Sequence, residues 1–250
     1  MAELTPMKRQ YNEIKSQYSD CLLFFRLGDF YEMFDEDAVV ASRELELALT
    51  TRDRNVENPD ERTPMCGVPY HSAEGYIGKL ISAGYKVAIC EQTEDPALAK
   101  GLVSRDVIRI ITPGTVTESS MLEEGRSNYV CSVFLDNTGG AVAFCDVSTG
   151  EFCVAGFESA PVTHIQNELA RFMPREAVLS AGALENRELC TFLSKKLDCL
   201  IEKGNERFDY MMGAARACAQ FNVRDIDALG LSNDNASVCA AGGLLSYIIE

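Results

Sequence analysis

The chain has 250 residues, 46% of them hydrophobic, and carries a formal net charge of −15 at pH 7. This length allows two domains of ordinary size, and the hydrophobic fraction is that of a folded protein. No apolar run reaches membrane-spanning length, which argues against a membrane protein, and the acidity argues against nucleic-acid binding by charge alone. The N-terminus shows no signal-peptide pattern, so we expect a cytoplasmic protein.

The ten cysteines are scattered, and no Cys-x-x-Cys pair occurs. A zinc site needs closely spaced ligand pairs, so the sequence argues against one. Most of the cysteines lie in apolar stretches, which predicts reduced, buried thiols. His71 lies in a Pro-Tyr-His-Ser loop, where a lone histidine is more often a hydrogen-bonding residue than a metal ligand.

The first predicted elements are a helix and a strand. Thr5 and Pro6 suit a helix start, and apolar residues at spacings of three or four continue the helix to about Tyr18. The apolar run at residues 21–27 predicts a strand buried on both faces. Gly28-Asp29 then breaks the run, as these residues do where a chain turns.

An aromatic segment, Phe-Tyr-Glu-Met-Phe, follows this break at residues 30–34. If the chain is extended there, Phe30 and Glu32 project to one side, and Tyr31 and Met33 project to the other. An aromatic ring on a stiff loop can push between stacked bases, and a neighbouring carboxylate can hydrogen-bond a base edge. The competing interpretation is that Phe30 is a core residue, as most aromatics after a strand are.

The next elements complete a first α/β domain. Acidic residues at 35–37 favour a helix start, and the helix runs to about Leu47 with an inner face of small and apolar residues, namely Ala38, Ala41, Leu45 and Ala48. A polar loop is predicted at residues 50–64. Ser72 is expected to cap a helix that ends at Gly84, with Tyr76, Leu80 and Ile81 inward. Strands at residues 86–90 and 107–111 then predict a mixed sheet with packed helices in residues 1–115.

The second half predicts a different arrangement. Residues 116–127 are rich in Glu, Ser and Gly and are interpreted as a linker. An antiparallel meander is predicted at residues 129–135, 141–147 and 151–157, because Gly-containing turns separate these runs. Helices and strands then alternate, with helices expected at residues 161–172, 185–195 and 207–219 and strands at 177–179 and 199–201. The order βββαβαβα predicts an RNase H-like fold for residues 128–250.

Several sequence blocks resemble the bacterial MutS family of DNA mismatch repair proteins. The blocks are Leu-Leu-Phe-Phe-Arg-Leu-Gly-Asp-Phe-Tyr-Glu-Met-Phe at 22–34, Thr-Pro-Met-Cys-Gly-Val-Pro-Tyr-His at 63–71, Val-Ala-Ile-Cys-Glu-Gln at 87–92, and Val-Ile-Arg-Ile-Ile-Thr-Pro-Gly-Thr at 107–115. They follow the order and spacing of the family. A looser similarity continues at residues 146–152 and 240–247.

This resemblance implies a mismatch-recognition domain at residues 1–115 and a connector domain at residues 128–250. Phe30 is then expected to enter the minor groove and stack on the mispaired base, with Glu32 hydrogen-bonding that base. Arg52 is expected in a loop that reaches DNA, and Met65 is expected near the wedge. The implied partners are mismatched duplex DNA and, through the connector domain, MutL.

The resemblance also implies an ATPase with Mg and ATP in the full-length protein. This chain has no G-x-x-x-x-G-K-[ST] loop, because Gly78-Lys79 lies in an amphipathic helix without the upstream glycine. We therefore expect no cofactor here. The chain stops within an expected helix without a stop signal, so we expect a truncated chain. The resemblance implies that the dimerisation and ATPase parts lie outside it, so we expect this chain to be a monomer and the full-length protein to be a homodimer.

Two other interpretations remain open. An RNase H-like fold invites a metal-dependent nuclease, for which Asp146 is the tempting carboxylate. However, the strand at 129–135 contains no acid and Asp136 lies at its far end, so Asp146 is expected to cap a turn instead. The other alternative is that this acidic chain binds no DNA tightly by itself.

Overall fold

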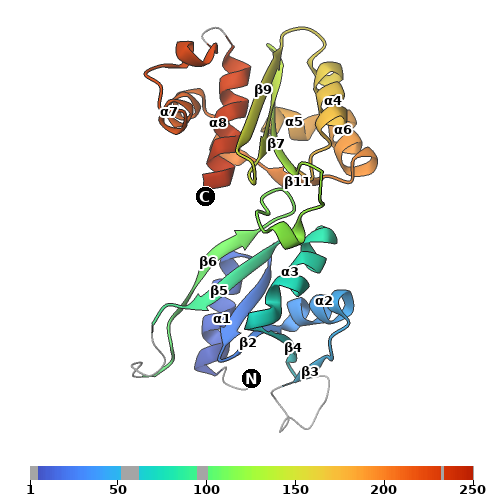
Figure 1. Ribbon diagram of the computed structural model, residues 1–250, viewed down its shortest axis with the longest axis vertical. Coiled ribbons are helices and arrows are strands. Elements are labelled where there is room, and N and C mark those ends of the chain that lie inside the picture. The colour runs from blue at the N-terminus through green and yellow to red at the C-terminus, as the bar shows by residue number, and fades with distance from the viewer. Residues whose placement is uncertain (1–4, 52–61, 95–100, 232–233, 250) are drawn as a thin grey trace. The chain divides into compact units, whose positions relative to one another are not determined.

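The computed structural model describes residues 5–51, 62–94, 101–231 and 234–249. The chain divides into two compact units, Met1–Thr112 and Pro113–Glu250. Both are mixed α/β, as predicted, and each is built around its own sheet (Figure 1). Among the described residues, no helix has both the length and the apolar character that crossing a bilayer requires.

The sheet of the first unit is mixed. Its strands follow the order β3-β4-β2-β1-β5-β6, where β1 and β5 are parallel and the other neighbours are antiparallel. Both ends of the predicted loop at 50–64 belong to the sheet, as β3 and as the first residue of β4. The strands are β1 (Leu22–Leu27), β2 (Phe30–Phe34), β3 (Thr50–Thr51), β4 (Pro64–Pro69), β5 (Val87–Gln92) and β6 (Arg105–Ile111).

Helices cover both faces of this sheet. The helix α1 (Pro6–Gln17) starts as predicted, with Thr5 Oγ1 accepting a hydrogen bond from Lys8 N at 3.3 Å. Its Tyr11 packs edge-on against Phe25 and Phe34 of the sheet. The helices α2 (Asp35–Leu45) and α3 (Ala73–Ser82) cover the opposite face, the latter after a short 3₁₀ helix η2 (Tyr70–Ser72) (Figure 1).

Three details of these helices differ from prediction. Helix α2 ends at Leu45, because Glu46 adopts a left-handed conformation with φ of 55°, and Ala48 is exposed rather than inward. Ser72 makes no capping hydrogen bond because the chain enters α3 from η2. Ile77 takes the buried position expected for Tyr76, which is half-buried.

The second unit begins with the predicted antiparallel meander. Its strands follow the order β11-β10-β7-β8-β9, and β10 lies parallel to both β7 and β11. The strands are β7 (Tyr129–Leu135), β8 (Gly140–Asp146), β9 (Glu151–Phe157), β10 (Glu176–Leu179) and β11 (Leu200–Lys203).

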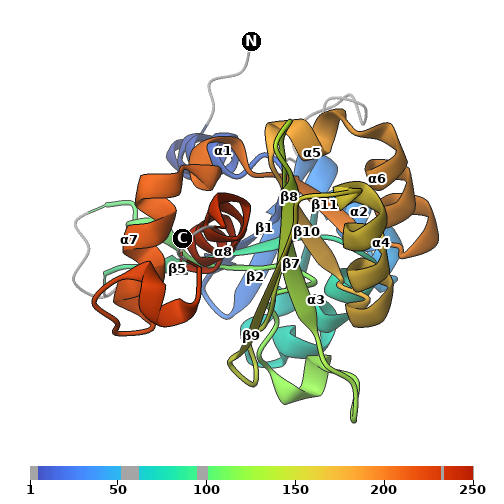
Figure 2. The ribbon, with the colours of Figure 1, turned by 90° about the horizontal axis from the view of Figure 1, so that it is seen from above.

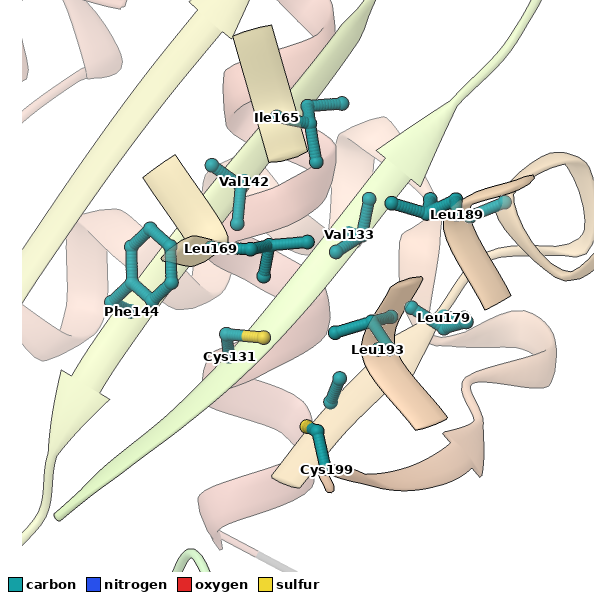
Figure 3. Close-up of a cluster of buried hydrophobic side chains, with 12 residues drawn as sticks. Cys131, Val133, Val142, Phe144, Ile165, Leu169, Leu179, Leu189, Leu193 and Cys199 are labelled. Carbon is teal, nitrogen blue, oxygen red and sulfur yellow. The ribbon is translucent and has the colours of Figure 1, made fainter. Parts of the chain in front are cut away.

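One face of this sheet carries α4 (Pro161–Phe172), α5 (Ala181–Glu185) and α6 (Arg187–Thr191), and the other carries α7 (Tyr210–Gln220) and α8 (Asn235–Ile249) (Figures 1 and 2). The core on the α4 face joins side chains of β7 and β8 to Ile165, Leu169 and Leu193 (Figure 3). Shorter helical turns complete the chain at η3 (Ser119–Met121), η4 (Phe192–Lys196), η5 (Asn205–Phe208) and η6 (Ile226–Leu229).

The predicted helix at 185–195 is wrong in detail. The short helix α5 already ends at Glu185, and a second short helix, α6, starts after Asn186, whose side chain caps it by accepting from Leu189 N at 3.0 Å. A wider π-type turn follows, closed by Leu197 N donating to Phe192 O at 3.2 Å. Asparagine competes for backbone hydrogen bonds, which breaks a helix that the apolar spacing alone would continue.

Candidate nucleic-acid interface

The candidate interface is the tip of the β1–β2 hairpin. Leu27 pairs with Phe30, so Gly28 and Asp29 form a two-residue turn. Gly28 has φ of 59°, which matches a type II′ turn, where glycine takes the first central position. The sequence therefore places Phe30 at the first position of a strand, directly after a tight turn.

The alternation predicted for residues 30–34 is present. Phe30 is 45% exposed, whereas Tyr31 and Met33 are buried on the reverse face. Phe34, on the same face as Phe30, is covered by Tyr11 of α1. The interpretation of Phe30 as a core residue is therefore wrong, because nearly half of its surface is exposed.

Glu32 lies half-buried between two strands. Its cross-strand partners are Phe25 on β1 and Gly67 on β4. A Cβ atom added to Gly67 would lie 3.4 Å from Glu32 Cγ and 3.1 Å from Tyr31 O. The glycine thus leaves room for the Glu32 side chain, as glycine within a strand often does at a close approach. A glycine between apolar strand residues was the sequence signal for this contact.

Of the other two expected DNA contacts, the structure describes only Met65. Met65 pairs with Phe34 on β4 and packs against the hydrophobic cluster under α1. It shares a face with Phe30 but is four residues along β2, roughly 13 Å away at strand rise. The structure therefore does not bring Met65 next to the Phe30 ring. Arg52 lies outside the described residues.

Cationic groups near the hairpin bind other protein groups. Arg105 is buried, and its guanidinium donates to Arg26 O at 2.7 Å and to Gln10 Oε1 at 3.0 Å. Burial lowers the pKa of Arg105 below its usual value. The Arg26 guanidinium donates to Glu91 Oε1 at 3.2 Å. Both arginines therefore stabilise the fold at this edge of the sheet.

Tyr31, Glu91 and Arg26 form a polar cluster on the reverse face of the hairpin. The Tyr31 hydroxyl donates to the Glu91 carboxylate, beside Arg26. Burial and this neighbouring carboxylate raise the pKa of Tyr31 to about 12, so its hydroxyl stays protonated and can donate. Sequence reasoning missed Arg26 and Glu91, although a charged residue inside an apolar strand was a visible signal.

The acidic residues considered for a nuclease lie apart. Asp146 ends β8 opposite the start of β7, whereas Asp136 follows the end of β7, so the two carboxylates lie at opposite ends of this strand pair. Asp146 accepts hydrogen bonds from Ser148 N at 3.0 Å and Ser148 Oγ at 2.6 Å, which confirms the predicted turn cap. Within the described ranges, no three His, Cys, Asp or Glu side chains gather as a metal site would require.

A buried carboxylate in the second unit was not anticipated. Glu176 opens β10 and is fully buried. Its Oε2 accepts from Gly114 N at 2.9 Å, and its Oε1 accepts from the Tyr247 hydroxyl. These partners tie the segment after Thr112 and the helix α8 to the sheet, which is a structural role.

All ten cysteines are free thiols, and seven of them are buried, with Cys153, Cys190 and Cys218 partly exposed. The prediction of burial therefore holds for most positions. Desolvation raises the pKa of Cys66 and Cys145 to about 11, so these thiols are poor nucleophiles at neutral pH.

Comparison with known proteins identifies the family. The family model described as MutS domain I matches residues 5–120, and the one described as MutS domain II matches residues 128–250. The chain is 57% identical to the DNA mismatch repair protein MutS of Clostridium botulinum strain Hall, over 99% of this chain and 26% of the relative. It is 48% identical to that of Acetivibrio thermocellus, over 99% of this chain and 28% of the relative.

The chain thus spans little more than a quarter of the length of these curated relatives. Two adjoining domain matches account for nearly all of its residues, in the order in which the two units occur. The chain belongs to the MutS family of DNA mismatch repair proteins and comprises the region of MutS domains I and II.

Proposed function

We propose that this chain recognises mispaired or unpaired bases in duplex DNA and thereby initiates mismatch repair. Phe30 enters the minor groove and stacks on the mispaired base, and Glu32 hydrogen-bonds that base. The observation that carries the proposal is the exposed Phe30 ring, which follows a tight turn in a strand whose next residue is buried. Family membership supports the same function.

In this proposal, the protein distinguishes mismatched from matched DNA by how easily the DNA deforms. A mismatched step costs less to unstack and kink than a paired one. Unstacking costs about a few kcal/mol per step, and each 1.4 kcal/mol saved gives about a tenfold preference. Arg52 and Met65 are proposed as secondary DNA contacts. The register of Met65 opposite Phe34 places such a contact away from the Phe30 ring.

For the second unit we propose a connector domain of RNase H-like topology, which relays the DNA-bound state to the ATPase and docks MutL. The strand order β9-β8-β7-β10-β11, with β10 parallel to β7, supports this topology. The proposed division is a recognition domain at 1–115, a linker at 116–127 and the connector at 128–250. The whole protein is proposed to be a cytoplasmic homodimer that binds ATP and Mg outside this region, and this chain alone is proposed to be a monomer.

The experiment is a comparison of mismatched with matched oligonucleotide duplexes at one salt concentration, with the whole-length protein that carries this chain. Phe30→Ala is expected to abolish the preference for the mismatch, because the stacking ring is lost. Phe221→Ala is the matched control, since Phe221 is a similarly exposed phenylalanine (40%) in the second unit. A mismatch preference that survives in Phe30→Ala contradicts the wedge.

A further inference from the structure

The turn that carries Phe30 is bonded from the reverse face of the sheet. Arg26 pairs with Tyr31, so its side chain lies on the face opposite Phe30. Its Nε donates to Gly28 O at 2.6 Å, and its Nη1 donates to Glu91 Oε1 at 3.2 Å. One guanidinium therefore joins the turn to strand β5.

Tyr70 completes this arrangement from a different segment. Its ring centroid lies 3.5 Å from the guanidinium carbon of Arg26, which is close stacking. Its backbone N–H donates to Asp29 O at 3.0 Å. The carbonyls of both turn residues, Gly28 and Asp29, thus accept hydrogen bonds from the Arg26–Tyr70 pair.

A wedge at a hairpin tip needs such support. The Phe30 ring is nearly half exposed, so packing on its own face cannot hold the turn in place. Any freedom of the tip must be lost when the ring enters DNA, which weakens binding to the mismatch. Stiffness then comes from the Arg26 guanidinium on the reverse face, which bonds Gly28 O and stacks on the Tyr70 ring, and from the Tyr70 backbone N–H, which bonds Asp29 O.

We propose that Arg26, together with the Tyr70 ring, is a positioning residue for Phe30; this inference rests on the proposed function. Arg26 acts through the turn and not on phosphates. Its side chain is 16% exposed, and its guanidinium is held by Glu91, Gly28 O and the Tyr70 ring. The planar guanidinium donates in two directions while stacking, which lysine cannot do.

The test uses the whole-length protein and measures affinity for mismatched and matched duplexes across a salt series. Arg26→Ala and Arg26→Lys are both expected to lower the mismatch preference about tenfold, with matched-duplex affinity within about twofold of wild type. Tyr70→Ala is expected to act similarly. Tyr70 is 43% exposed, so this variant keeps the test informative if Arg26→Ala fails to fold. Tyr70→Phe keeps the ring and is expected to match wild type. Arg43→Ala, which removes an exposed arginine of α2, is the charge control.

A second readout follows the turn directly. Hydrogen exchange at the Tyr70 amide is expected to speed up in Arg26→Ala and to stay unchanged in Arg43→Ala. Equal losses for both duplexes, with a salt slope reduced by about one, would make Arg26 a phosphate contact and overturn the proposal. Full preference in Arg26→Lys would also overturn it, since charge alone would then suffice.

The Phe30→Ala variant distinguishes failure of the proposed function from failure of the positioning role. If Phe30→Ala keeps the mismatch preference, the proposed function fails, and the positioning role fails with it. If Phe30→Ala loses the preference while Arg26→Ala and Tyr70→Ala keep it, the wedge stands and the positioning role alone is overturned.

Discussion

At the scale of single residues, adjacent side chains at the hairpin tip have different roles. Phe30 is exposed and Tyr31 is buried, because successive residues of a strand point to opposite faces. Glu32 then lies beside Gly67, where the missing Cβ leaves space for its side chain. One strand thus anchors itself in the core and presents two chemically distinct groups on its other face.

Glu32 provides the sharpest residue-scale prediction. Glu32→Ala is expected to lower mismatch preference by about tenfold, while affinity for matched duplex holds or rises, because a charge that repels phosphates is removed. Glu32→Gln keeps the size of the side chain and separates shape from charge. The measurement is binding of both duplexes by the whole-length protein at matched salt. Equal weakening for every duplex would contradict a base-specific role.

Asp136 gives a pH-dependent prediction for the second unit. Burial alone would raise the pKa of this carboxyl, but hydrogen bonds from the Thr138 hydroxyl and from the Thr138 and Gly139 N–H groups hold it below the ordinary value of 3.8. A carboxyl whose pKa is lower in the folded state contributes stability at pH values above its unfolded-state pKa. That contribution is lost as the pH falls through the folded-state pKa. Asp136→Asn should therefore lower the free energy of unfolding most near neutral pH.

This difference between wild type and Asp136→Asn is expected to shrink as the pH falls below about 4, the region of the unfolded carboxyl pKa. Urea unfolding between pH 2.5 and 7 measures it. A difference independent of pH would show that the carboxylate charge contributes nothing and that the turn is held by other contacts.

At the scale of elements, the packing of α7 on α8 depends on two glycines. A Cβ added to Gly242 would lie 2.1 Å from the Gly213 Cα, and one added to Gly213 would lie 3.0 Å from Val238 O. Helix α8 is buried around most of its circumference, between the sheet and α7. The apolar sequence of α8 predicts burial, but the point of closest approach follows from the helix crossing.

Gly242→Ala is expected to destabilise the second unit by about 3 kcal/mol, because the helices must move apart to admit the methyl group. Gly75→Ala in α3 is the matched control, since nothing lies within 4 Å of its added Cβ. It is expected to be neutral or stabilising by about 0.5–1 kcal/mol, the difference between glycine and alanine in a helix. Urea denaturation of each variant measures both, and equal effects would contradict this packing.

At the scale of the whole molecule, the net charge of −15 opposes binding to a polyanion. Arg26 and Arg105, two arginines close to the hairpin, are bonded to protein groups. The recognition chemistry and the grip on phosphates are therefore expected to be separated, with most of the grip in parts of the whole protein that this chain does not span.

The 250-residue chain alone is accordingly expected to bind any duplex with a dissociation constant of about 10⁻⁴ M or weaker at physiological salt, at the weak end of non-specific DNA binding. The whole-length protein, measured in parallel by fluorescence anisotropy, is expected to bind mismatched duplex far more tightly. Submicromolar binding by the chain alone would contradict the separation of recognition from phosphate contact.

Much of this architecture could be predicted from local sequence. The helix at Pro6, the meander of β7–β9 and the helix α4 follow from capping residues, turn residues and periodicity, which act over a few positions. The segment at 185–195 could not be predicted, because Asn186 ends one helix and caps the next while the apolar spacing continues across both.

By itself the sequence determined the alternation at residues 30–34, the turn before it and the family to which the chain belongs. The tertiary structure alone decided that Phe30 is exposed, that Gly67 stands beside Glu32, and that Arg26 and Tyr70 bond the carbonyls of the turn. The reason is physical: alternation and turns arise from neighbouring residues, whereas exposure and support depend on strands and helices that are distant in sequence and meet only when the sheet has formed.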